Sequence, residues 1–153
     1  MSAEARIREL KLELPPPPKP AGVYKPVVVI GNLAYVSGHG PLRSDGTMIT
    51  GRVGAELDER AAYQAARQTG LAILSSLRAA LGSVDRLKRL IKTLGMVNGT
   101  PNFERHPAVI NGYSELMAEI LGPDNGVGAR SAVGMGSLPG NIAVEIEAIF
   151  ELA

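Results

Sequence analysis

The sequence predicts an α+β domain in which two helices pack on one face of a mixed or antiparallel sheet. Three observations predict this class: a β-hairpin in residues 24–37, two amphipathic helical segments at residues 57–81 and 107–121, and an alternating strand at residues 142–152. Two helices combined with such a sheet make an α+β sandwich. The length of 153 residues is that of one domain with a substantial hydrophobic core.

The first 20 residues are predicted to form a helix and a proline-rich arm that precede a single domain at residues 21–153. In residues 1–14, apolar side chains recur at helical spacing between charged ones, namely Ile7, Leu10 and Leu14. The four prolines at 15–18 cannot continue a helix and favour polyproline II. We interpret them as a stiff spacer, with a ligand for a proline-recognition module as the alternative.

A β-hairpin is the first element expected in the domain. Tyr24–Ile30 ends in four β-branched residues, and Leu33–Ser37 returns after the two-residue turn Gly31-Asn32. Residues 38–41 are expected to be a flexible segment that exposes its backbone. A further glycine turn then precedes a short strand at residues 47–51.

Two helical segments follow the hairpin. At residues 57–81, alanines and other apolar residues recur in steps of three and four, so this helix can lie close to a sheet. Gly82 is placed to end it. Residues 107–121 begin with a proline that suits the first turn of a helix. Between the helices, residues 86–97 resemble a strand whose candidate core residues are Leu87, Leu90, Ile91, Leu94 and Val97.

The C-terminal segments are expected to complete the sheet. Residues 130–136 form a short predicted strand, and residues 142–152 alternate apolar side chains with Glu145, Glu147 and Glu151. Two helices on one face leave the other face of the sheet uncovered. We expect that face to be buried between copies of the chain in an oligomer.

Composition restricts the classes of function. The net charge is +1, from 16 basic and 15 acidic residues, which argues against a dedicated nucleic-acid binder. The chain has no cysteine and only two histidines, without metal-ligand spacing, so we expect no metal. No apolar stretch is long enough to span a membrane, and residues 1–14 do not resemble a secretory signal. A cytoplasmic enzyme or binding protein is the default expectation.

Four residues are candidates for chemistry by their type and position. The guanidinium of Arg130 suits a bidentate contact with a substrate carboxylate, with a surface cation as the plain alternative. Glu145 can position or deprotonate a water molecule if its sheet face is buried between subunits, and is otherwise a solvated strand residue. The spacing of Tyr24, just before the first strand, favours the interpretation that its ring covers the core as an aromatic lid. His39 can be an acid, a base or a loop residue, and its position does not decide among these.

Several motifs resemble those of one family. In chain order they are Gly22–Tyr24, Gly31-Asn32, Tyr35–His39, Asn102-Phe103, Ala129–Val133, Leu138-Pro139 and Val144–Ala148. The last three arrive with close spacing and are the most specific. Over about residues 18–152 the chain is similar to the RidA family, formerly YjgF, whose members are also called L-PSP endoribonucleases or translation-inhibitor-like proteins.

The resemblance implies a chorismate-mutase-like fold and a homotrimer with a central barrel and clefts between subunits. It implies hydrolysis, without a cofactor, of reactive 2-imino or 2-enamino acids such as 2-aminoacrylate to 2-keto acids and ammonia. The substrate is thus a small carboxylate-bearing metabolite. By motif position, Arg130 binds the carboxylate and Glu145 helps to hold the hydrolytic water. Further pocket positions are Tyr24, Ser37, Gly38 and the carbonyl of Ala132.

The chain departs from the family pattern in places that concern the substrate. His39 stands where the family has glutamine. Asn111 is the nearest counterpart of the family's pocket asparagine, although alignment through Tyr113 places Ile110 there. The segment 98–113 is longer than usual, and the N-terminal arm is atypical. These differences indicate a divergent subgroup and leave the substrate open.

Two other functions stay open from the sequence. The first is a regulatory protein that binds a small carboxylic acid in the same cleft without turnover. The second is an endoribonuclease or translation inhibitor, as an older family name suggests. Near-neutral charge and few aromatic residues argue against the second, because single-stranded RNA binds in cationic grooves that carry stacking rings.

Overall fold

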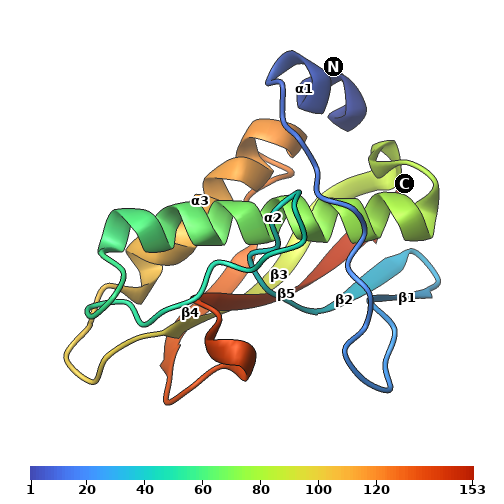
Figure 1. Cartoon of the computed structure of the whole chain (residues 1–153). Helices are drawn as coiled ribbons and strands as arrows, with labels where there is room; N and C mark the ends of the chain where they lie inside the picture. Colours follow the sequence, from blue (N-terminus) through green and yellow to red (C-terminus); the bar gives the residue numbers. More distant parts are fainter.

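A five-stranded mixed sheet forms one layer of the molecule in the computed structural model, which describes residues 1–153 (Figure 1). The strands lie in the order β1-β2-β5-β3-β4, and only the β3–β4 pair is parallel. Helix α3, His106–Leu121, is the crossover that this parallel pair requires. From β1 to β4 across the sheet, the strands are Val27–Ile30, Leu33–His39, Val144–Leu152, Leu87–Asn98 and Ala129–Met135.

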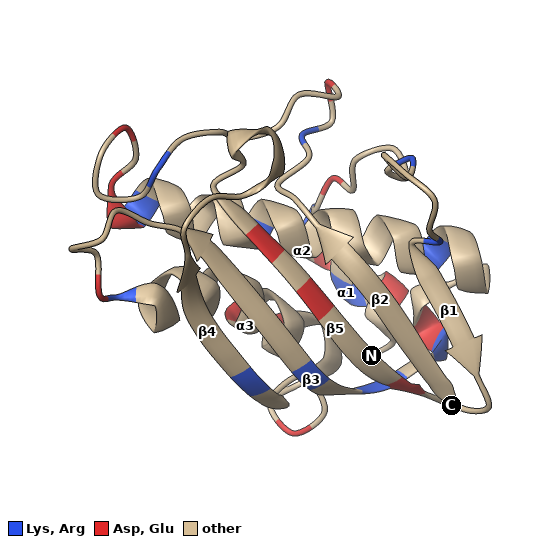
Figure 2. Ribbon diagram, turned by 90° about the horizontal axis from the view of Figure 1, so that it is seen from below, with Lys and Arg blue, Asp and Glu red and all other residues tan.

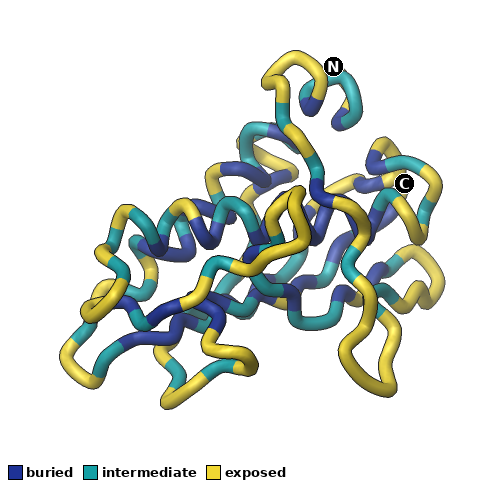
Figure 3. Tube along the Cα trace, viewed as in Figure 1, coloured by how far each residue is buried: buried dark blue, intermediate teal, exposed yellow.

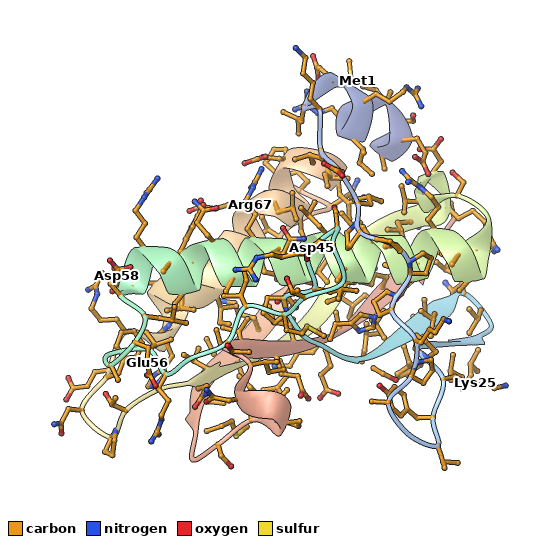
Figure 4. The ribbon with its side chains drawn as sticks, viewed as in Figure 1. Met1, Lys25, Asp45, Glu56, Asp58 and Arg67 are labelled. Carbon is orange, nitrogen blue, oxygen red and sulfur yellow. The ribbon has the colours of Figure 1, made fainter.

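Two helices, α2 (Glu59–Leu81) and α3, cover one face of this sheet, so the predicted α+β architecture is confirmed. Helix α2 begins at Asp58, whose side chain accepts a hydrogen bond of 2.8 Å from the backbone N–H of Ala61 (Figure 4). It ends at Gly82, whose φ of 84° lies in the left-handed region that favours glycine. Both ends therefore follow from capping residues that the sequence carries.

The hydrophobic core lies between the helices and the sheet (Figure 3). Strand β5 alternates as predicted, because its glutamates occupy the positions between buried apolar residues. Helix α2 contributes mainly small buried residues to this core, which lets it approach the strands closely. The buried residues of β5 are Val144, Ile146, Ala148, Phe150 and Leu152.

The predicted core of β3 is correct in part. Leu87, Leu90 and Val97 are buried, whereas Ile91 and Leu94 are only partly buried. The pairing of β3 with β5 shifts register twice, between Leu87 and Arg89 and between Leu90 and Lys92. Each irregularity changes which face the following residues occupy, so the strand does not keep a simple alternation. Leu94 consequently lies on the face of the sheet opposite to the helices.

The face of the sheet opposite to the helices carries no helix of this chain (Figure 2). It contains a hollow of about 440 Å³ lined in part by Tyr35, Leu94 and Glu147. Large apolar side chains are exposed here and on the adjoining strands, including Val28, Tyr35 and Val133. The uncovered face expected from the sequence is thus present in the single chain.

The N-terminal helix α1, Ala3–Glu9, is shorter than the predicted residues 1–14. Lys11 has a φ of 53°, and the N–H of Leu12 donates to the carbonyl of Ile7, which together form the left-handed ending that stops a helix. Ala3 and Ile7 join the hydrophobic core. Residues 10–26 then run without helix or strand toward β1, and the division of the chain at residue 20 stays a prediction.

The short strand expected at residues 47–51 does not form. This segment makes only isolated bridges, of Leu42 with Met48 and of Thr50 with Ile142. Its backbone hydrogen bonds are divided between its own loop and the segment after β4. The result is a loop that lies beside residues 139–142 at one end of β5.

Candidate functional site

A cavity of about 710 Å³ lies at the end of β2, beside the start of β5. Three separate segments form its walls: the N-terminal arm, the loop around Met48 and the turn at Pro139-Gly140. Ile142 and Glu147 also line it. The cavity brings together five of the eight residues that the sequence singled out, namely Tyr24, Ser37, Gly38, His39 and Glu145.

Glu145 lies directly over Gly38 at the floor of this cavity. The β2–β5 pairing is irregular between Val36 and His39, so the ladder opens where Gly38 meets the carboxylate. A Cβ atom built on Gly38 would lie 2.9 Å from Cδ of Glu145, which shows that only glycine leaves room for the side chain as placed. The absence of a side chain at residue 38 therefore positions the Glu145 carboxylate.

The Glu145 carboxylate is half-buried and belongs to none of the ion pairs of the chain. Burial raises its pKa above the usual value for glutamate, and the nearby negative charge of Glu147 raises the pKa further. A carboxylate with a raised pKa and free lone pairs is a good acceptor for a proton from water. This arrangement suits the orientation and deprotonation of a water molecule.

Ser37 connects β2 to the segment before β1, and Tyr24 lies within that segment. The Ser37 hydroxyl donates to the carbonyl of Lys25 at 2.6 Å, and the Ser37 N–H donates to the carbonyl of Pro26 at 2.9 Å. Tyr24 accepts a 3.2 Å hydrogen bond from the N–H of Ala21 and is 47% exposed. The expectation that Tyr24 forms a lid on the core is therefore wrong, because its ring lines the cavity instead.

His39 is part of β2 and is buried, so the expected flexible segment at residues 38–41 begins later than predicted. Its Nδ1 lies 2.6 Å from the carbonyl oxygen of Ser37, and its Nε2 lies 2.8 Å from Oγ of Ser76 on α2. A carbonyl only accepts, so Nδ1 carries the proton and Nε2 accepts from the Ser76 hydroxyl. Burial also lowers the pKa of His39. The neutral imidazole thus fixes the backbone at Ser37, beside the cavity.

Arg130 and Ala132 lie outside the cavity, on the edge strand β4. Both are paired with residues of β3 that face the helices. One Nη atom of Arg130 donates to Oγ of Ser114 at 3.0 Å, and the other donates to the carbonyl of Pro107 at 3.3 Å. The guanidinium forms no ion pair with any carboxylate of the chain. Strand β3 separates β4 from β5, so one chain does not place Arg130 beside Glu145.

Neither residue considered for the pocket asparagine lines the cavity. Asn111 is partly buried on α3, and Ile110 is fully buried against Gly95.

Sequence reasoning missed Asn98, which is buried at the end of β3. Its Nδ2 donates to Oδ1 of Asn141 at 3.0 Å and to the carbonyl of Ile142 at 3.1 Å. An asparagine at the end of an apolar strand was the available signal, and its role is to fix the rim of the cavity.

Sequence reasoning also missed the cavity's apolar lining. Leu42, Met48 and Ile142 line it, and so does the N-terminal arm.

The chain contains no group of three or more histidine, cysteine, aspartate or glutamate side chains arranged to hold a metal ion. None of its helices is both long and apolar enough to cross a bilayer.

Comparisons with known proteins agree with the motifs. Residues 4–146 match the family model described as "YjgF/chorismate mutase-like, putative endoribonuclease". The chain is 38% identical over 148 residues to protein TCP17 of Trypanosoma cruzi, covering 97% of this chain and 92% of the relative.

Two solved structures resemble the whole chain or most of it. The protein Atu1372 of Agrobacterium tumefaciens is 42% identical, with a TM-score of 0.88 and coverage of 99% of this chain and 92% of its own. RidA from an Antarctic Psychrobacter species is 26% identical, with a TM-score of 0.62 and coverage of 88% and 93%. The family model spans nearly the whole chain, and the motifs, the fold and these relatives all agree with it. This protein therefore belongs to the RidA family, formerly YjgF, with its chorismate-mutase-like fold.

Proposed function

We propose that this protein hydrolyses reactive 2-imino or 2-enamino acids to 2-keto acids and ammonia, without a cofactor and in the cytoplasm. The observation that carries the proposal is the unpaired Glu145 carboxylate, held over Gly38 in a cavity with its pKa raised. Membership of the RidA family supports the same chemistry. A single activated water is enough for this reaction, so no protein nucleophile is needed.

A 2-enamino acid first tautomerises to its imine, as a proton is added at C3 and one is lost from nitrogen, and water then adds to the imine. Glu145 accepts a proton from the water as the oxygen attacks the electrophilic carbon of the protonated imine, which gives a carbinolamine. The proton on Glu145 then passes to the amine nitrogen. The carbon–nitrogen bond breaks as Glu145 takes the proton of the hydroxyl, and the 2-keto acid and ammonia form. Glu145 then gives this proton to the ammonia, which leaves as ammonium. Because such imines already hydrolyse in water, positioning that lowers the barrier by a few kcal/mol suffices.

The substrate carboxylate is held by Arg130 of a second copy of the chain. Within one chain, Arg130 lies on the far edge of the sheet from the cavity and has no acidic partner. Its guanidinium contacts only neutral groups, Ser114 and the carbonyl of Pro107, so its charge is available to a ligand. An assembly in which the edge strand β4 of one chain meets the cavity of the next would bring this arginine to a neighbouring cavity.

The test uses 2-aminoacrylate released in situ by a pyridoxal-phosphate enzyme, with pyruvate formation as the readout. We expect native protein to accelerate hydrolysis above the spontaneous rate and Glu145→Gln to slow it by roughly 10- to 1000-fold. The acid limb of the pH profile, where protonation removes the base, should disappear in this variant. Glu104→Gln, at an exposed site without hydrogen-bond partners, is the matched control.

Arg130→Lys tests the carboxylate contact separately. Lysine keeps the charge but loses the two-pronged geometry, so kcat/KM should fall by about one to two decades while the fold survives, as circular dichroism would show. Arg60→Lys, on the exposed side of α2, is the control. Binding of 2-keto acids without any acceleration would instead favour the regulatory function. RNA cleavage that survives repurification and is lost in Arg130→Ala would favour the endoribonuclease.

A further inference from the structure

The cavity has a polar side and an apolar side. The polar side is the floor, where Ser37, Glu145 and Glu147 lie. Near Gly40, a built Cβ atom would lie 3.0 Å from Cδ1 of Ile142 and 3.3 Å from Sδ of Met48, so these two side chains form one apolar cluster. The other apolar residues that line the cavity are Pro18, Pro20, Ala21, Tyr24, Pro26, Leu42 and Pro139. A substrate with its reacting carbon at Glu145 therefore meets apolar surface with the rest of its structure.

The N-terminal arm, here residues 15–22, supplies much of that apolar surface, and helix α1 anchors the chain before it. The Glu4 carboxylate forms an ion pair of 2.6 Å with Arg78 of α2 and accepts a 3.1 Å hydrogen bond from the N–H of Val84. The ion pair with Arg78 lowers the pKa of Glu4. Ile7 of α1 is buried in the hydrophobic core. These contacts fix the point from which the arm extends.

Two further contacts hold the arm along its course. The Ser75 hydroxyl of α2 donates to the carbonyl of Pro15 at 2.6 Å, and this pair is buried. At the other end, the N–H of Ala21 donates to the Tyr24 hydroxyl at 3.2 Å. Between these anchors Pro18 and Pro20 face the cavity, and their rings restrict φ, so the segment keeps one shape. The arm is a fixed wall of the site.

We propose that this arm determines substrate specificity, and that the preferred substrates are 2-imino acids with an apolar side chain larger than the methylene of 2-aminoacrylate. The proposal rests on the proposed function of the same cavity. Each methylene buried against the arm should improve kcat/KM roughly two- to fourfold. This role would account for the contacts that hold the N-terminal segment against the cavity.

The experiment compares imines of increasing side-chain size. An amino-acid oxidase with catalase generates them from alanine, 2-aminobutyrate, methionine and leucine, and 2-keto-acid formation is followed. The test variant is Pro18→Ser/Pro20→Ser, which removes apolar contacts from the cavity. The matched control is Pro16→Ser/Pro17→Ser, because these neighbouring prolines are exposed and do not line the cavity. Melting temperatures of both variants are compared with that of the native protein.

We expect the native protein to prefer the leucine-derived imine over the alanine-derived one. In Pro18→Ser/Pro20→Ser this preference should fall by about 5- to 20-fold, with the alanine-derived rate changed less than twofold and the control unchanged. Hydrolysis of all four imines with an identical ratio in native and test variant would overturn the role of the arm and leave the proposed function intact. Absence of hydrolysis for every imine would overturn the proposed function, and the role of the arm with it.

Discussion

At the scale of single residues, the contact between Gly38 and Glu145 is the feature on which the proposed chemistry depends. Without a side chain at residue 38, the carboxylate lies over the backbone of β2, where it loses hydration and meets the charge of Glu147. Both effects raise its pKa. The family motif predicts both residues, but it does not reveal their contact, because that contact depends on the irregular pairing of β2 with β5.

Gly38→Ala should separate this contact from general stability. The new Cβ atom would overlap the end of the flexible Glu145 side chain, which can move, so unfolding free energy should change by no more than about 1 kcal/mol. The displaced carboxylate should slow hydrolysis by roughly 100-fold. Gly136→Ala, where nothing lies within 4 Å of the added atom, is the control. Steady-state kinetics and thermal unfolding test both expectations. Native kinetics in Gly38→Ala would argue against the placement of Glu145.

At the scale of elements, local pattern predicted those elements whose burial follows from their own residues. The hairpin, α2, α3 and β5 are of this kind, since turn, capping and alternation signals lie within each segment. The end of β2 was not predicted, because His39 becomes buried only through Ser76 on α2, 37 residues away. The stripe of α1 suggested a longer helix, because no pattern reveals the left-handed Lys11. The path of the N-terminal arm could not be predicted either, because it depends on the hydrogen bond from Ser75 of α2 to the carbonyl of Pro15.

The burial of His39 at the end of β2 predicts a pH dependence of stability. Its folded pKa lies below the unfolded value of 6.5, so the unfolded chain binds a proton more readily. The corresponding stability is fully present above pH 6.5 and is lost as pH falls from 6.5 toward the lowered folded pKa. Urea unfolding between about pH 8 and pH 5 should show this slope in native protein and lose it in His39→Gln.

Ser76→Ala is the control for that experiment. It removes the hydroxyl that donates to Nε2 but keeps the imidazole buried against the Ser37 carbonyl. This variant should be less stable than the native protein at every pH and should keep the slope between pH 6.5 and lower values. An equal slope in native protein and His39→Gln would show that other groups cause the pH dependence.

At the scale of the whole molecule, the candidate residues divide into two groups that one chain does not bring together. Glu145, Gly38 and Ser37 lie at the cavity, whereas Arg130 and Ala132 lie on the edge strand β4. The motifs predict which residues belong to a site. Their positions across the sheet depend on the order of the strands, which pairs segments that are far apart in the sequence. The open face between these groups exposes apolar side chains, so both the chemistry and the hydrophobic surface favour an assembly.

We therefore expect a homotrimer in solution, and Leu94→Glu should disrupt it. Leu94 lies in the hollow of the open sheet face, where a charge buried between copies would be costly. Light scattering at micromolar concentration should give three chain masses for native protein and one for Leu94→Glu, with hydrolysis lost and circular dichroism unchanged. Leu10→Glu, at the exposed end of helix α1, which lies on the helix side of the molecule (Figure 1), should stay trimeric and active. A native protein of one chain mass that hydrolyses imines at full rate would contradict the assembly, and the Arg130 of each chain would then have no route to a neighbouring cavity.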